Sequence, residues 1–252
     1  MHALAHYSSL DAAARTASAL VWTYMNASDA PRVLRAAWGD GAKAAHKALL
    51  DASKAADEGG GTVPCAVVFD VDDTLLLHDG AAIGPMVALA RALHAMGAVV
   101  HIVTAREDAS TLRAETEAAL ARLGVVYKTL WMTNSTQPRG WEAISKWKGS
   151  CRAKIERAHK APVVLSIGDV FGDMTLVKSE KHMDALETQR KASVAANVVA
   201  MHPHSLRYKH TLYRLAPADH ALWGLKLPIQ FRVKVGGKEH VLDEEEMHKL
   251  ET

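Results

Sequence analysis

The chain has very few cysteines and no excess of charge of either sign. Cys65 and Cys151 are the two cysteines among 252 residues, and they match no metal-ligand spacing. A disulfide framework or a zinc site is therefore not expected, and both thiols are interpreted as reduced and structural. Lysine and arginine total 30 and aspartate and glutamate total 28, so the charge balance alone indicates neither a nucleic-acid-binding nor a membrane-surface protein.

A signal peptide pattern and a membrane span are also missing. Residues 1–7 lack a positive region followed by an apolar core, and no apolar run is long enough to cross a bilayer. With 49% hydrophobic and 23% charged residues, the composition is typical of an ordinary globular protein. We therefore expect a cytoplasmic protein with no membrane partner, and its oligomeric state stays open.

Helical and strand patterns divide the chain into three predicted parts. Residues 1–60 are rich in alanine and carry apolar residues at helical spacing, which predicts a helical extension that packs on the core. Residues 61–205 alternate apolar strands with amphipathic helices and form the predicted core. In residues 206–252, two alternating segments flank Gly236-Gly237 and predict a β-hairpin in a carboxyl-terminal appendage.

The alternation in the core predicts an α/β fold with three layers, in which helices cover both faces of a mainly parallel sheet. Strands are expected at 66–70, 98–103, 126–132, 163–167 and 197–201. Gly97 and Gly124 are expected to end the helices before the second and third strands. A further helix is expected from about Gly149, and a polar helical insert with a solvated face is expected over 175–196.

The first predicted strand of the core ends in a cluster of carboxylates. The apolar residues 67–69 run directly into Asp70-Val71-Asp72-Asp73-Thr74. Ionised carboxylates are strongly disfavoured in an apolar setting unless they are paired. We therefore expect a cationic partner at this strand end.

Polar side chains follow three other segments of the predicted core. They are Thr104 and Arg106 after the second strand, with the backbone N–H of Ala105 between them, Lys146 and Lys148 just before a helix, and Asp169 and Asp173 after the fourth strand. The carboxyl ends of parallel strands open on one edge of a sheet, where ligands bind in α/β proteins. We therefore expect these side chains to surround one site.

Taken in order, these residues resemble the haloacid dehalogenase (HAD) superfamily of phosphotransferases. The matching elements are Asp70-x-Asp72-x-Thr74, Thr104, Lys148 and Gly168-Asp169-x-x-x-Asp173. Residues 69–75, the helix from Thr111 to Leu120, and Trp147-Lys148 followed by Arg152 are most similar to subfamily IIIB, the branch of acid phosphatases and vegetative storage proteins. The resemblance covers about residues 60–205 and implies a Rossmann-like HAD fold, with a minimal cap because only residues 76–84 are available for one.

The resemblance also implies how the reaction proceeds. Asp70 would be the nucleophile that forms an aspartyl-phosphate, and Asp72 would donate the proton to the leaving group. Lys148 would stabilise the phosphoryl group, although Lys146 lies near the same position and remains an alternative. Thr104 and Ala105 would complete the phosphate site, and Arg106 would either contact the phosphate or substrate or form a structural ion pair.

Magnesium is the cofactor that the resemblance implies, since this small cation prefers oxygen ligands. Asp70 and Asp169 would bind it through their side chains, and Asp72 through its backbone carbonyl. Asp173 and Thr74 would support the site.

The substrate stays open at this point. The leading hypothesis is hydrolysis of small phosphate esters such as nucleotides or sugar phosphates. A phosphatase for protein or nucleic-acid ends is the alternative, favoured by the basic run from Arg207 to His210. A storage or scaffold protein with vestigial activity is a third hypothesis, weakened because Asp70 is present.

Overall fold

The structure is a computed structural model that describes residues 2–7, 10–26, 64–77, 79–134, 140–197, 210–227, 232–235 and 238–241. Its elements, in chain order, are β1 (His2–Tyr7), α1 (Leu10–Asn26), β2 (Ala66–Phe69), α4 (Gly84–Ala95), β3 (Val99–Glu107), α5 (Ser110–Arg122), β4 (Thr129–Thr133), α6 (Trp141–His159), β5 (Val163–Gly168), the 3₁₀ turn η2 (Phe171–Asp173), α7 (Glu180–Asn197), β6 (His210–Arg214), the 3₁₀ turn η4 (Pro217–Asp219), β7 (Trp223–Lys226), β8 (Arg232–Val235) and β9 (Lys238–Val241).

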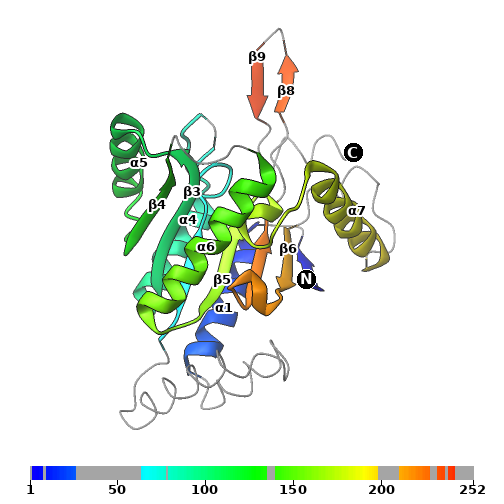
Figure 1. Cartoon of the computed structure of the whole chain (residues 1–252), viewed down its shortest axis with the longest axis horizontal. Helices are drawn as coiled ribbons and strands as arrows, with labels where there is room; N and C mark the ends of the chain where they lie inside the picture. The colour runs from blue at the N-terminus through cyan, green and yellow to red at the C-terminus, as the bar shows by residue number, and fades with distance from the viewer. Residues whose placement is uncertain are drawn as a thin grey trace.

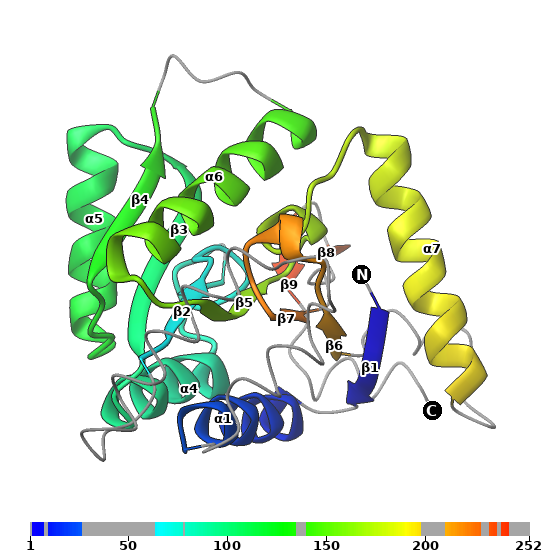
Figure 2. The ribbon, with the colours of Figure 1, turned by 60° about the horizontal axis from the view of Figure 1, so that its bottom comes forward.

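Seven strands form one sheet in the order β1-β6-β7-β5-β2-β3-β4 (Figures 1 and 2). The five strands from β7 to β4 are mutually parallel. At the other edge, β6 pairs antiparallel with β7, and β1 pairs antiparallel with β6. The chain moves outward from β2 to β3 and β4, then returns to place β5 on the opposite side of β2, so the strand order reverses around β2.

Helices cover both faces of this sheet. Successive side chains of β2 point to opposite faces of the sheet, so Val67 and Phe69 belong to one buried cluster and Ala66 and Val68 to the other. The first cluster contains buried residues of α1, α4 and α5, and the second contains buried residues of α6 with Met183 and Leu186 of α7 packed against it. The predicted three-layer α/β architecture with a mainly parallel sheet is confirmed.

Four of the expected strands are present as β2, β3, β4 and β5. The fifth, expected at 197–201, lies outside the described residues except for Asn197, which ends α7. The strand beside β5 is instead β7, which pairs with β5 from Leu165↔Trp223 to Gly168↔Lys226.

The predicted boundaries at 60/61 and 205/206 do not delimit the sheet. β6 and β7 come from the predicted carboxyl-terminal appendage, and β1 comes from the predicted helical extension. These strands continue the sheet beyond β5 because backbone pairing and burial of Leu212 and Leu225 join them to the same core. Within 1–60, the described residues hold one strand and one helix.

Several local predictions are confirmed. Gly97 and Gly124 follow helices α4 and α5 with φ of 96° and 63°, a backbone region that favours glycine. The polar insert is helical as α7, and β8 and β9 form an antiparallel hairpin. The helix expected from about Gly149 begins earlier, at Trp141. Among the described residues, no helix is both long and apolar enough to cross a lipid bilayer.

Candidate active site

Strand register brings the predicted site residues to one edge of the sheet. Phe69 of β2 is level with Ile102 of β3 and with Ile167 of β5. Asp70 follows β2 at once, and its backbone N–H donates to the carbonyl of Ile167 at 3.0 Å. Thr104 and Asp169 each lie two residues beyond these paired positions. The carboxyl ends of three adjacent strands therefore form one polar site beside the reversal of strand order.

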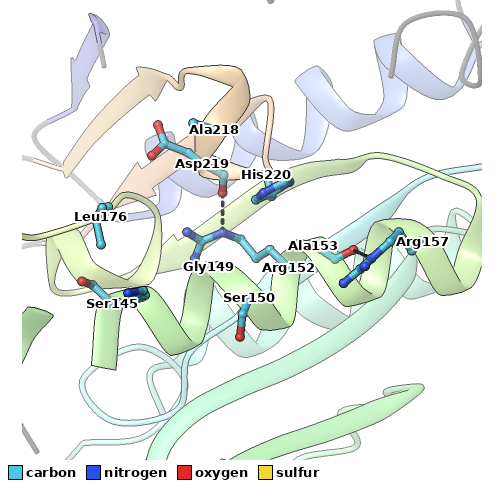
Figure 3. Close-up of a pocket in the computed structure, with 11 residues that line it drawn as sticks. Ser145, Gly149, Ser150, Arg152, Ala153, Arg157, Leu176, Ala218, Asp219 and His220 are labelled. Atoms are coloured by element: carbon cyan, nitrogen blue, oxygen red, sulfur yellow. Dashed lines mark hydrogen bonds between the residues drawn. The ribbon is translucent and has the colours of Figure 1, made fainter. Parts of the chain in front are cut away.

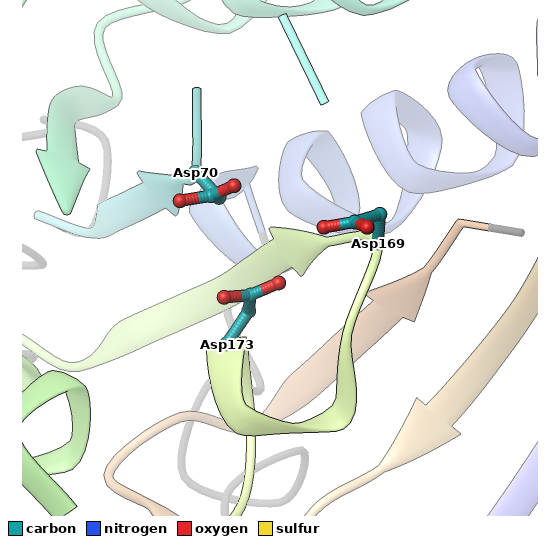
Figure 4. Close-up of side chains that lie close together, drawn as sticks. All are labelled: Asp70, Asp169 and Asp173. Atoms are coloured by element: carbon teal, nitrogen blue, oxygen red, sulfur yellow. The ribbon is translucent and has the colours of Figure 1, made fainter. Parts of the chain in front are cut away.

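Three buried aspartates gather at this edge. Asp70, Asp169 and Asp173 each offer a carboxylate oxygen, and these oxygens lie within 4.8 Å of one another. Figure 4 shows Asp70 at the end of β2 and the other two on the loop that follows β5. The sequence predicts a supporting role for Asp173, and the structure places its carboxylate among the other two.

The loop after β5 holds Asp173 in this position. Its carboxylate accepts a hydrogen bond from the N–H of Val170 at 3.0 Å. Its carbonyl accepts hydrogen bonds from Ser166 Oγ at 2.7 Å and from Arg152 Nη1 at 2.5 Å. Gly168 permits the tight fold of the loop, because a Cβ there would lie 1.9 Å from Oδ2 of Asp173.

Lys148 is the lysine that reaches the acidic cluster. Its Nζ donates to Oδ1 of Asp70 at 2.7 Å and to Oδ1 of Asp173 at 2.5 Å, and the side chain is almost fully buried. Lys146 is exposed and is positioned elsewhere on α6. The arrangement supports Lys148 over Lys146 as the lysine of the site.

Burial and mutual repulsion disfavour ionisation of the carboxylates. Burial raises the pKa of Asp70 to about 7. Lys148 lowers this pKa, but the negative charges of Asp173 and Asp72 raise it and partly cancel the effect of Lys148. Burial, Asp173 and Asp70 raise the pKa of Asp169 well above its usual value. Burial lowers the pKa of Lys148, but Asp173 and Asp70 outweigh this effect and raise it. Full ionisation of all three carboxylates would place more negative charge here than Lys148 offsets, so ionisation is disfavoured unless a further cation is added.

This residue set fits a magnesium ion. The three carboxylates provide oxygen donors close enough to share one cation, and such hard oxygen ligands are those that Mg²⁺ prefers. Asp169 is the member that Lys148 does not contact, so an added cation beside it would offset the remaining repulsion. The side chain of Asp72 is directed to another partner, and its predicted role as a backbone ligand stays a prediction.

That partner is Arg106. Its Nη2 donates to Oδ1 of Asp72 at 2.6 Å, and its Nε lies 3.1 Å and 3.0 Å from the two carboxylate oxygens. Nη1 of Arg106 donates to Oγ1 of Thr116 on α5 at 3.0 Å. Arg106 thus joins the predicted proton donor to a neighbouring helix.

The remaining predicted residues lie in β3 and in the turn that follows β2. Thr104 is fully buried, and its Oγ1 accepts a hydrogen bond from the N–H of Arg106 at 3.3 Å. Thr74 is also fully buried, and its Oγ1 has no partner among the described residues. Ala105 is exposed, and its carbonyl accepts a hydrogen bond from Oγ1 of Thr133.

Sequence reasoning missed Lys226, which ends β7. It is buried, donates to the carbonyl of Leu227 at 2.6 Å and lies over the ring of Phe171. Burial lowers its pKa to about 8, while Glu187 and Asp169 act in the opposite direction. The sequence signal that could have identified it is a lysine inside the otherwise apolar run 222–227.

A separate cavity of about 320 Å³ lies along α6 (Figure 3). Its wall is formed by α6, Leu176 and the turn that carries Ala218, Asp219 and His220. Nε of Arg152 donates to the carbonyl of Asp219 there at 2.7 Å. Since Arg152 also holds Asp173, it ties this wall to the acidic site.

Comparisons with known proteins add little to this geometry. No family model matches the chain, and no curated protein matches it. A chain in the solved structure of the Pnkp1/Rnl/Hen1 complex is similar, with 24% sequence identity and a TM-score of 0.37. The likeness covers 43% of this chain and 40% of that chain, so this chain spans less than half the length of its neighbour, and the likeness assigns neither family nor activity.

Proposed function

We propose that this protein is a magnesium-dependent phosphomonoester hydrolase of the HAD superfamily that works through an aspartyl-phosphate at Asp70. One observation carries the proposal: the strand-end carboxylates of Asp70, Asp169 and Asp173 converge, and Lys148 bridges two of them. Such a site combines a nucleophile with positive charge for a phosphoryl group. The resemblance of the sequence to subfamily IIIB is the support for the finer assignment.

In the first half of the reaction, a carboxylate oxygen of Asp70 attacks phosphorus while the bond to the leaving oxygen breaks. Asp72 gives a proton to that oxygen, so the product leaves as an alcohol. Lys148 and the backbone around Ala105 stabilise the negative charge of the transferring phosphoryl group. Burial of Asp70 removes competing water from the nucleophile.

In the second half, Asp72 takes a proton from a water molecule that attacks phosphorus. The bond between phosphorus and the Asp70 oxygen breaks, which releases phosphate and restores the Asp70 carboxylate. Asp72 is then protonated again and ready for another turnover.

Asp70, Asp169 and Asp173 would hold the magnesium ion. Bound there, it would offset the charge of the carboxylates and of the phosphoryl oxygens and orient the phosphate for attack. Two residues would keep these ligands in place, Arg152 through the carbonyl of Asp173 and Gly168 through the tight loop.

A panel of phosphate esters tests the proposal: an aryl phosphate, mononucleotides, sugar phosphates, phosphopeptides and end-phosphorylated oligonucleotides. Each is assayed with magnesium, with a chelator and with Asp70→Asn. We expect turnover of at least one class that both the chelator and the substitution abolish. Turnover that survives both would contradict the proposal, and uniform inactivity with magnesium would favour a storage or scaffold protein.

A further inference from the structure

The pair formed by Asp72 and Arg106 conflicts with the role proposed for Asp72. Both carboxylate oxygens of Asp72 accept hydrogen bonds from Arg106, at distances of 2.6 Å to 3.1 Å. A guanidinium offers only donors, and this two-pronged contact is among the strongest that a carboxylate makes. To hand a proton to a leaving oxygen, Asp72 must give up at least part of this contact.

The pair lies where a substrate can reach it. The side chain of Asp72 is 45% exposed and that of Arg106 is 18% exposed. Thr116 provides a second anchor, since its Oγ1 accepts from Arg106 and donates to the carbonyl of Leu112 at 2.7 Å. Arg106 is therefore held at one end by α5 and at the other by Asp72.

We propose that Arg106 selects phosphate esters whose leaving group carries a second anionic group, and that this anion draws the guanidinium away from Asp72. The inference rests on the proposed function and names its substrate class. Terminally phosphorylated oligonucleotides belong to this class, because a phosphodiester follows the scissile phosphate. Esters of neutral alcohols do not.

Geometry sets which anion Arg106 reaches. A proton donor must come within about 3 Å of the leaving oxygen, and Arg106 is in hydrogen-bond contact with that same carboxylate. An anionic group a few bonds beyond the leaving oxygen is then within reach of the guanidinium. Phosphate matches the paired N–H donors of arginine as well as a carboxylate does. When Arg106 moves from Asp72 to the phosphate of the substrate, one strong contact replaces another, and Asp72 is free to donate its proton.

The decisive comparison uses two substrates that differ only in this charge. One is a dithymidine phosphorylated at a terminus and joined by a phosphodiester, and the other has a neutral methylphosphonate linkage in its place. We expect the wild-type kcat/KM to be at least about tenfold higher for the phosphodiester, and Arg106→Ala to bring the ratio near one. Arg106→Lys keeps the charge without the fork and should give an intermediate ratio.

Arg113→Ala is the matched control, since Arg113 is an exposed arginine of α5 that pairs with Asp108 and Glu117. It should leave the ratio unchanged. Equal turnover of the two linkages by the wild-type protein would overturn the inference even if Arg106→Ala failed to fold, and the proposed function would stand. An equal loss on both substrates in Arg106→Ala would also overturn it, whereas inactivity of the wild-type protein on every ester would remove the proposed function itself.

Discussion

Gly168 and Asp173 approach each other so closely that a Cβ on Gly168 would lie 1.9 Å from Oδ2 of Asp173. The same Asp173 carboxylate accepts from Lys148, which in turn contacts Asp70. The absence of a side chain at residue 168 is therefore a condition for the acidic site, and it explains the glycine in the run Gly168-Asp169.

Gly168→Ala should displace Asp173 and disrupt the site. We expect a loss of about 1–3 kcal/mol in the free energy of unfolding from the overpacked loop, and at least about a hundredfold loss in kcat/KM from misplaced groups. Gly149→Ala, in the interior of α6 and with 3.7 Å to its nearest neighbour atom, should instead stabilise by about 0.5–1 kcal/mol. Denaturant unfolding and ester hydrolysis measure both, and wild-type behaviour of Gly168→Ala would contradict the close approach.

Lys148→Met and Lys146→Met form a matched pair on one helix. Lys148→Met leaves two buried carboxylates without their contacting cation, which should cost about 3–5 kcal/mol in the free energy of unfolding. It should also lower kcat by about a hundredfold or more. Lys146→Met changes an exposed side chain and should stay within about 0.5 kcal/mol of wild type. The reverse order of effects would assign the site to Lys146.

Asp169→Asn should stabilise the metal-free protein at neutral pH. The pKa of Asp169 is raised by burial and by Asp173 and Asp70, and that of Asp70 is raised to about 7. An unfolded aspartate ionises near pH 4, so between about pH 4 and 7 the folded state binds more protons and the free energy of unfolding falls as pH rises. In Asp169→Asn, the free energy of unfolding should fall less steeply as pH rises. Lower stability of the variant at pH 7 would contradict the predicted repulsion.

Magnesium provides the complementary measurement. A ligand that binds only the folded state raises its stability by mass action. Magnesium should therefore raise the Tm of the wild-type protein, more at pH 8 than at pH 5, and leave that of Asp169→Asn nearly unchanged. A similar shift in both proteins would place the ion elsewhere.

His101 should make stability sensitive to mild acid. Its Nδ1 lies 2.6 Å from Oγ1 of Thr129, and this oxygen also accepts a hydrogen bond from Nε1 of Trp131. We therefore infer that the Thr129 hydroxyl donates its hydrogen bond to an unprotonated Nδ1 of His101. Burial, then His159 and Lys128, lowers the pKa of His101 to about 4. The unfolded state thus binds more protons between about pH 6.5 and 4, and this contribution to stability is lost as pH falls through that range.

His101→Gln should remove that loss, because glutamine does not titrate there. The exposed His94→Gln in α4 is the control and should follow wild type. The measured quantity is the difference in free energy of unfolding between variant and wild type across this pH range. If the difference between His101→Gln and wild type did not change with pH, the lowered pKa of His101 would be contradicted.

The parallel core of the fold was predictable because its signals are local. Apolar runs such as 163–167 and helix-ending glycines mark each element within a few residues. β1 and β7 were missed because their places in the sheet depend on pairing with distant segments, as in Ala3↔Tyr213 and Leu165↔Trp223, and β6 lies between them. Backbone pairing of that kind leaves little trace in the composition of either strand.

The same distinction holds for the site. Asp70 and Asp169 could be placed because each follows a recognisable strand, and Thr104 because it belongs to the apolar run that forms β3. The family resemblance favoured Lys148, but residue pattern alone could not exclude Lys146, since that depends on which face of α6 packs inward. Ser145, Lys148 and Arg152 share its buried face. The partner of Arg106 was also beyond sequence reasoning, because Asp72 lies 34 residues away and reaches it only through the parallel pairing of β2 and β3.

Covalent capture of phosphate on Asp70 is the most direct test of the central claim. The protein is mixed with a radiolabelled phosphate ester and magnesium, quenched in acid within the first turnover, digested and mapped by mass spectrometry. The account predicts label on the peptide that contains Asp70, lost on treatment with hydroxylamine and missing in Asp70→Asn. Active hydrolysis with no labelled peptide, or label on a peptide without Asp70, would contradict it.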